Sequence, residues 1–448
     1  MNQTEKALAL AESIGGKNRL NCIAEIDETA AEQAREQEAD KQDKLLAGIP
    51  VLVKDNIDVK GLHTTAGSLA LADNIAREDA PVIRNLRRNG AVILGKTNMT
   101  EFANYTTEGM PGGYSSRGGQ VIHAVNPKLS PTGSSSGSAV AVAAGIVPMA
   151  VGTDTSHSVT ACAMFNGICG LKPPAGALSA EGIIPIARTL DSAGAMARDL
   201  TDALKLYSAM RDEPLPELKP LKLDGLRIAV NRAQRETLPG RRKRFLNSLL
   251  KRLKAGGAVI GEVDQKAAPE MVTIMRWEFR PMLEAYLKKS TAKRKTLAEI
   301  VAYYEANPDT MMKYGDTLLR AALDETPGGL RGKPYLDALE ARREAVKRVT
   351  AEIENDDAVL TTGPTSIMHF CGLPTVTVAG GKKNADGVNE AVILYGKDEC
   401  RLYEAALAIE QVMLKMGGSG DESKKEKSHF DRFFLAHFSN RSCSGLVF

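Results

Sequence analysis

The sequence predicts an α/β fold, because from Gly48 onward short apolar runs alternate with segments of helical pattern. The 448 residues are enough for one large domain or for two to three ordinary ones. A content of 43% hydrophobic and 25% charged residues is typical of a globular protein. The longest apolar stretch, residues 139–151, is too short to span a bilayer and is interrupted by Gly145 and Pro148.

Individual elements follow from local patterns along the chain. Residues up to about Asp43 have a helical pattern, and a helix capped by Asp79 is expected to carry Pro81 in its first turn and Asn89-Gly90 at its end. Further helices are expected at residues 138–144, at most of 266–354 and at about 400–414. Strands are expected at residues 49–53, 91–94, 149–151, 226–230, 258–261, 358–360, 375–378 and 391–394.

Charge and cysteine content exclude several classes of function. A formal net charge of +3 over this length indicates neither a nucleic-acid nor a membrane partner. The six cysteines are scattered without a CxxC pair, which argues against a disulfide framework or a metal site and for reduced thiols in the cytoplasm. The first sixteen residues lack the long apolar core of a signal peptide.

Three polar segments carry the chemistry, and each adjoins an apolar run. Their sequences are Val53-Lys54-Asp55-Asn56, Gly133-Ser134-Ser135-Ser136-Gly137-Ser138 and Gly152-Thr153-Asp154-Thr155-Ser156-His157-Ser158. In content, order and spacing they resemble the amidase signature family, whose serine hydrolases use a Ser-Ser-Lys triad. Twenty-four positions separate Ser134 from Ser158, as in the family pattern. The resemblance is highly specific from about Leu20 to Leu204 and fainter to about Gln411.

The resemblance implies a single large α/β domain with a central mixed β-sheet covered by helices. This domain would span residues 1–415, with its core at 44–205 and a helical region on the substrate side at about 260–355. Residues 416–448 begin with Gly and Ser followed by Glu and Lys, a composition typical of a flexible tail.

The resemblance also assigns the catalytic roles. Ser158 would be the nucleophile that forms an acyl-enzyme, Ser134 the bridging hydroxyl, held by a cis peptide bond, and Lys54 the ultimate base. A lysine can act as a base only when neutral, so its pKa must fall several units below about 10.4. Burial behind an apolar strand favours that shift, and in an extended chain the side chain of Asp55 points to the opposite face.

The turn before Ser158 departs from the family pattern Gly-Thr-Asp-Thr-Gly-Gly-Ser-Ile-Arg. Ser156 and His157 replace its two glycines, and Thr160 replaces its arginine. The backbone amides of Thr155, Ser156, His157 and Ser158 would form the oxyanion hole. Amides serve whatever the side chain, provided that the backbone angles suit residues with a Cβ. The replacements are therefore expected to reshape the pocket and to leave the catalytic groups in place.

Substrate contacts are expected from Met110, Gly133 and Ser134, with residues 102–113 lining the pocket. Cys162 is expected to be a small buried residue, with no sign of an activated thiolate.

Residues 90–97 match the phosphate-loop pattern GxxxxGK[ST]. That motif needs a strand before a flexible loop. Here a helix comes first and the four intervening residues form the strand itself, so Lys96 is interpreted as structural.

The expected function is hydrolysis of a small-molecule carboxylic amide to the acid and ammonia or an amine, without metal or other cofactor, in the cytoplasm, with a homodimer as one expected assembly. Three alternatives stay open: the glutaminase subunit of a tRNA-dependent amidotransferase, a non-catalytic amidase-like scaffold or binding protein, and a nucleotide-binding enzyme.

Overall fold

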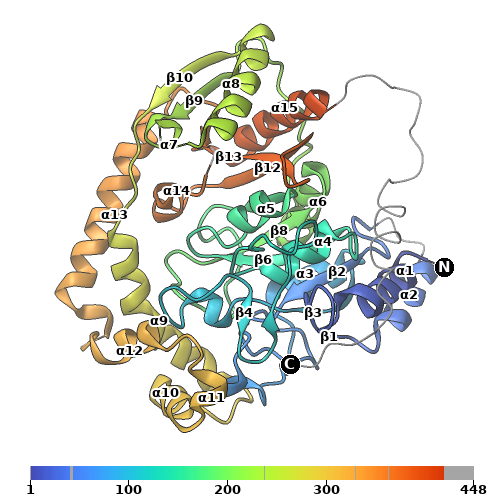
Figure 1. The fold of residues 1–448 in the computed structure, drawn as a ribbon, viewed down its shortest axis with the longest axis vertical. Coiled ribbons are helices and arrows are strands. Elements are labelled where there is room, and N and C mark those ends of the chain that lie inside the picture. The colour runs from blue at the N-terminus through green and yellow to red at the C-terminus, as the bar shows by residue number, and fades with distance from the viewer. Residues whose placement is uncertain (1, 41–43, 237, 328, 362, 418–448) are drawn as a thin grey trace, which may run out of the picture.

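Within the residues that the structure describes, eleven strands join into one mixed sheet that crosses the molecule from β10 and β9 at the top to β3 and β1 at the lower right (Figure 1). This computed structural model describes residues 2–40, 44–236, 238–327, 329–361 and 363–417. The strand order is β1-β3-β2-β6-β8-β7-β12-β13-β11-β9-β10. Two groups pair in parallel, β3-β2-β6 and β11-β9-β10, while the remaining pairs are antiparallel.

The strands of the large sheet are β1 (Ile23–Ile26), β2 (Pro50–Lys54), β3 (Val92–Thr97), β6 (Met149–Asp154), β7 (Cys169–Lys172), β8 (Ser192–Ala197), β9 (Arg227–Asn231), β10 (Val259–Val263), β11 (Ala358–Thr361), β12 (Thr375–Lys383) and β13 (Asn389–Tyr395). A separate two-stranded sheet pairs β4 (Tyr114–Ser115) with β5 (Gly119–Gln120).

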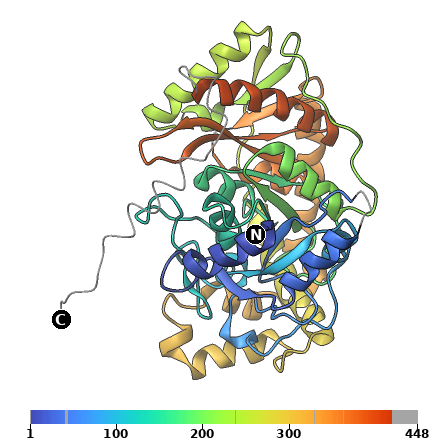
Figure 2. The ribbon, with the colours of Figure 1, turned by 90° about the vertical axis from the view of Figure 1, so that its right-hand side faces the viewer.

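The α-helices are α1 (Gln3–Leu10), α2 (Ala30–Ala39), α3 (Pro81–Arg88), α4 (Ser136–Ala143), α5 (Thr160–Asn166), α6 (Leu200–Met210), α7 (Arg232–Glu236), α8 (Gly240–Ala255), α9 (Glu270–Lys289), α10 (Leu297–Ala306), α11 (Pro308–Met311), α12 (Thr317–Asp324), α13 (Lys333–Glu352), α14 (Ser366–Phe370) and α15 (Glu399–Gly417). Short 3₁₀ helices lie at Leu69–Leu71, Glu101–Asn104 and Gly329–Arg331, and a π-helix at Ala11–Gly15 extends α1. The long helices α9 and α13 pack together on the left in Figure 1, and α15 packs on β12 (Figure 2).

Alternating strand residues build the two sides of the core. In β2, Val51 and Val53 join the larger apolar cluster, whereas Leu52 joins a second cluster that includes residues of α4 and α5. Successive side chains of a strand point to opposite faces of the sheet. By this alternation Lys54 follows Leu52 to the face that α4 and α5 cover, and Asp55 follows Val53 to the other.

The predicted α/β class, the mixed sheet and its covering helices are confirmed. Residues 1–43 were expected to be helical throughout, which is wrong, because they contain the edge strand β1. Strands β7 and β8 were not predicted. The helix after Asp79 begins at Pro81 with Ala80 as its N-cap, because the Asp79 carboxylate accepts a hydrogen bond from Arg87 (2.9 Å) instead of capping the helix.

The predicted tail at 416–448 lies almost wholly outside the described residues. Helix α15 continues to Gly417, so the expected boundary at residue 415 falls within its last turn. In the part of the chain that the structure describes, no helix is long and apolar enough to cross a membrane.

Candidate active site

The three polar segments meet beside the carboxyl ends of β2 and β6. Lys54 is the last residue of β2, and Ser158 lies in the turn between β6 and α5. Because β2 and β6 are parallel neighbours, their carboxyl ends share one edge of the sheet. Ser134 lies just before α4, which packs on both strands.

Lys54 is buried and contacts the predicted bridging serine. Its Nζ lies 2.8 Å from Ser134 Oγ, 2.7 Å from Thr153 Oγ1 and 3.3 Å from Thr153 O. A neutral amine has two N–H donors and one lone pair. It can therefore donate to both oxygens of Thr153 while it accepts the hydroxyl proton of Ser134. The side chain is 0% exposed, and this burial lowers the pKa of Lys54 to about 7, although the negative charges of Asp154 and Asp191 oppose the shift.

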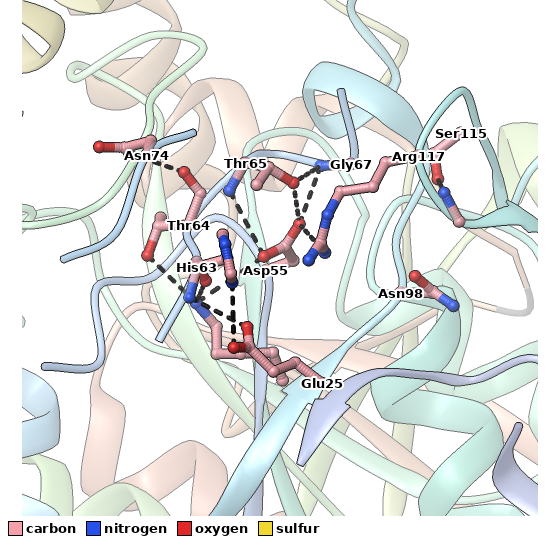
Figure 3. A network of polar contacts seen from close by, with 12 residues as sticks. Glu25, Asp55, His63, Thr64, Thr65, Gly67, Asn74, Asn98, Ser115 and Arg117 are labelled. Carbon is pink, nitrogen blue, oxygen red and sulfur yellow. Dashed lines mark hydrogen bonds and ion pairs between the residues drawn. The ribbon is translucent and has the colours of Figure 1, made fainter. Parts of the chain in front are cut away.

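Asp55 is turned away from Lys54 by a separate set of partners, as the strand alternation predicts. Its Oδ2 accepts hydrogen bonds from the Gly67 N–H (3.1 Å) and the Thr65 hydroxyl, and lies 3.6 Å from Arg117 Nη1. Figure 3 shows the carboxylate directed toward these three residues. Its charge is thus balanced on the face of the sheet opposite Lys54.

Lys96 belongs to this second network. Its Nζ donates to the carbonyl oxygens of Ile57 (2.6 Å) and His63 (2.7 Å) and lies 3.9 Å from Asp55 Oδ1. The residues before it form β3, and α3 precedes that strand. The segment 90–97 therefore lacks the loop of a phosphate-binding motif, and the structural interpretation of Lys96 is confirmed.

The segment that carries Ser134 packs closely against Thr100. The Gly133–Ser134 peptide bond is cis, and a Cβ on Gly133 would lie 2.3 Å from Thr100 Oγ1. A side chain at position 133 would have to displace the Thr100 hydroxyl, which accepts a hydrogen bond from the Gly113 N–H (2.8 Å). Beyond Ser134, the Ser135 hydroxyl donates to Thr153 O (3.0 Å) and the Ser138 hydroxyl to Val151 O (3.0 Å). These two serines tie α4 to β6.

Ser158 is held within its turn by the backbone. Its side chain is almost buried, at 6% exposed, and its carbonyl oxygen accepts a 3.4 Å hydrogen bond from the Ser135 N–H. Within the described residues, no hydrogen bond joins the hydroxyls of Ser134 and Ser158. Cys162 is buried nearby, and burial raises the pKa of its thiol to about 12 although Lys54 lies close, so it is a protonated thiol at neutral pH.

The predicted oxyanion segment accommodates its unusual side chains. Ser156 and His157 are half-buried, and neither they nor Thr155 and Ser158 adopt a positive φ. Their backbone therefore suits residues with a Cβ, as expected. The Thr155 hydroxyl donates to Asp191 Oδ1 (2.6 Å), and burial raises the pKa of Asp191 to about 7.

The predicted substrate residues lie beside the Ser134 segment. Met110 is buried, and a Cβ on Gly112 would lie within 3 Å of the backbone of Thr132 and Gly133, so the two segments pack directly together. A separate cavity of about 720 Å³ lies between α9, residues 178–188 and residues 74–81. Its wall reaches Asn56, Thr153 and Thr155, whereas Met110, Gly133, Ser134 and Ser158 do not line it.

Sequence reasoning missed several residues around the predicted triad. Thr153 and Asn56 are hydrogen-bonded to each other (3.1 Å). Both stand inside the three polar segments, so their place in the sequence could have indicated a role in the site. Lys172 and His369 lie outside the three polar segments, and no sequence pattern indicates that they belong near the site. In the described ranges, no group of three or more His, Cys, Asp or Glu side chains is placed to hold a metal ion.

Known proteins share both the sequence pattern and the fold. A family model described as Amidase matches residues 5–370. The chain is 31% identical to a probable amidase of Arabidopsis thaliana over 88% of this chain and 83% of that one. It is 38% identical to a glutamyl-tRNA(Gln) amidotransferase subunit from Deinococcus deserti over 58% of this chain and 55% of that one. The peptide amidase of Stenotrophomonas maltophilia superposes with a TM-score of 0.82 at 30% identity, covering 92% of this chain and 94% of that one.

Proposed function

The chain belongs to the amidase signature family, and from this premise we propose that it hydrolyses a carboxylic amide to the acid and ammonia or an amine. The observation that carries the proposal is the 2.8 Å contact between a fully buried Lys54 and Ser134, beside the turn that holds Ser158. A lysine whose pKa falls to about 7 is substantially neutral at physiological pH and can act as a base.

In the proposed mechanism, Lys54 takes the proton of Ser134 as Ser134 takes that of Ser158. The Ser158 oxygen then attacks the amide carbon, and the amides of residues 155–158 stabilise the oxyanion. The proton returns by the same path to the nitrogen of the leaving amine, and the C–N bond breaks. Water then attacks the acyl-enzyme, with the same groups as base and acid, and releases the acid. The contact between the two serines closes when substrate binds, since catalytic hydrogen bonds are often long in free enzymes.

Small amides and peptide amides are the first substrates to test, because a structural neighbour is a peptide amidase. The cavity borders Thr153 and Thr155, and we propose that it receives one of the two substituents of the amide, although Ser158 itself does not line it. A glutaminase subunit is the second proposal, based on the likeness to a glutamyl-tRNA(Gln) amidotransferase, and a non-catalytic scaffold is the third. Co-purification with partner subunits and ammonia release from glutamine would favour the second. A wild-type protein that neither reacts with a serine-directed reagent nor hydrolyses amides would favour the non-catalytic scaffold.

The direct test is treatment with a serine-directed fluorophosphonate followed by mass spectrometry of the peptides. We expect one label, on Ser158. Labelling of Ser134 or Cys162 in place of Ser158 would contradict the assigned nucleophile.

A further prediction concerns the two side chains that replace glycines in the turn. Ser156→Gly with His157→Gly should leave a working enzyme with a changed substrate preference, because both side chains are half-buried beside the reacting serine. Relative kcat/KM values among amides of different acyl size should shift by about 10- to 200-fold, the range of pocket contacts. If His157 were instead a general base, activity on all substrates would fall alike.

A further inference from the structure

The carboxylate of Asp154 closes the turn that carries Ser158. Asp154 is the last residue of β6, and its Oδ2 accepts hydrogen bonds from the backbone N–H groups of Val159 (2.7 Å) and Thr160 (3.1 Å). Ser158 lies between the residues that this carboxylate joins. A displacement of the Asp154 side chain would therefore move the serine with it.

The other oxygen of Asp154 faces a histidine from a distant part of the chain. His369 lies on α14, and its Nδ1 is 3.3 Å from Asp154 Oδ1. The ring is 0% exposed, and among the described residues neither of its nitrogens, nor Asp154 Oδ1, has a hydrogen bond. Burial lowers the pKa of His369 to about 3, so the ring is neutral at neutral pH and has one N–H to donate. In the tautomer protonated on Nδ1, the ring brings an N–H group close to Asp154 Oδ1, a polar contact that lacks the alignment of a hydrogen bond.

A buried lysine completes the cluster. Lys172 ends β7, is fully buried, and has no hydrogen bond to its Nζ within the part of the chain described. Burial lowers the pKa of Lys172 to about 8, partly opposed by Asp154, so it is mostly charged at neutral pH. Burial alone would raise the pKa of Asp154, yet its interactions with His369, Lys172 and the turn backbone hold that pKa below its usual value.

The charged groups around the cluster come from several elements. Lys54 of β2 lies close enough for Asp154 to raise its pKa, and the positive charge of Arg342 on α13 lowers that of Lys172. His157, on the oxyanion segment itself, lowers the pKa of His369 when charged. The turn supplies Asp154 with no cation of its own, since Thr160 stands where the family pattern has arginine. The positive charge that faces this carboxylate therefore comes from Lys172 of β7, and the neutral ring of His369 on α14 adds a polar contact.

A cluster of buried polar groups without hydrogen-bond partners contributes little to the stability of a protein interior. Buried polar groups without partners cost about 1–3 kcal/mol each, and apolar residues of similar volume often stabilise a fold at least as well as buried charges. The contacts of Asp154 with the Ser158 turn offer a better explanation of the cluster.

We propose that His369 is a positioning residue for the hydrolysis proposed above: it holds the Asp154 carboxylate and, through it, the turn that presents Ser158 and the oxyanion amides. The inference rests on the proposed function, because positioning has a purpose only where Ser158 reacts. His369 touches neither the substrate nor the reacting atoms in this role.

The test compares two substitutions of His369. His369→Leu removes the donor and keeps the space filled, and it should lower kcat and the rate of fluorophosphonate labelling of Ser158 by about tenfold or more, with KM changed by less than about threefold. His369→Asn retains an N–H near the position of Nδ1 and should recover most of the labelling rate. A folded His369→Leu variant with the wild-type kcat and labelling rate would overturn the proposal, as would an asparagine variant no faster than the leucine variant.

A second buried histidine provides the matched control. His123 contacts Phe165 O (3.0 Å) and the Val125 N–H (3.1 Å), and within the described residues it makes no hydrogen bond or ion pair with Asp154. His123→Leu should lower the unfolding temperature and leave labelling per folded molecule unchanged. Equal losses of labelling in both leucine variants would contradict a specific role for His369.

Thermal unfolding tests the contact itself, even if the leucine variant folds poorly. His369→Leu combined with Asp154→Asn should lower the unfolding temperature by less than the sum of the two single changes, because the residues interact directly. Additive shifts would contradict the contact. Failure of the proposed function has a different signature, a wild-type protein that neither takes up the label nor hydrolyses amides.

Discussion

Replacing Ser158 with alanine is expected to abolish both amide hydrolysis and fluorophosphonate labelling. Ser158 is the predicted nucleophile. The buried carboxylate of Asp154 closes its turn, and helix α5 follows directly. Without its hydroxyl no acyl-enzyme can form, so kcat should fall by about 10⁴-fold or more, leaving only what binding and the oxyanion amides contribute. The measurements are steady-state hydrolysis of a simple amide and mass spectrometry of the labelled protein.

Cys162 provides the control for that experiment. It is the buried thiol closest in sequence to Ser158, and burial keeps it protonated. Cys162→Ala should keep the label on Ser158 and should change activity only through packing. A Ser158→Ala protein that still hydrolyses amides, with label on Ser134 or Cys162, would show that the nucleophile lies elsewhere.

The meeting of the three candidate segments could be expected from the sequence because each segment is short and contiguous. Lys54, Ser134 and Ser158 stand in motifs whose spacing was visible in the chain. The alternation of Val51, Leu52 and Val53 between the two core clusters gives the direction of Lys54 from local geometry alone. This also explains why the opposite orientation of Asp55 was predicted correctly.

Some strands could not be predicted because their residues are small. Strand β8 reads Ser-Ala-Gly-Ala-Met-Ala and β7 reads Cys-Gly-Leu-Lys, neither of which has the β-branched and aromatic residues that favour strands. Both lie in the interior of the sheet, where neighbouring strands on both sides supply the pairing. A Cβ on Gly170 would lie 2.5 Å from the Ala163 side chain, so close packing by α5 requires a small residue there.

The supporting cluster could not be predicted for a different reason. His369 follows Asp154 by more than two hundred positions, and nothing in its local sequence indicates a partner. Only the folded sheet brings β6, β7 and α14 together. Residues that act through another side chain leave no motif of their own, so this part of the site had to come from the structure.

Lys54→Met should lower kcat by about 10²–10⁴-fold, the usual contribution of a general base, while KM changes little. Methionine has a similar length and no lone pair suited to accept the Ser134 proton. In the proposed mechanism only neutral Lys54 is active. Activity should therefore be low below pH 7 and rise with pH through an apparent pKa of about 7. The variant should lose this dependence, and a variant with near wild-type kcat would exclude Lys54 as the base.

Lys96→Met is the matched control, because Lys96 is equally buried but contacts the carbonyls of Ile57 and His63 on the other network. It should lower stability without moving the apparent pKa of activity. The pH dependence of unfolding provides a second test of Lys54. Lys54 has a lower pKa folded than unfolded, so between about pH 7 and 10.5 the unfolded chain binds more protons and wild-type stability should rise relative to Lys54→Met. The gain could reach about 5 kcal/mol across that range. A stability difference that stays constant with pH would mean that Lys54 is charged in the folded protein and cannot accept the proton of Ser134.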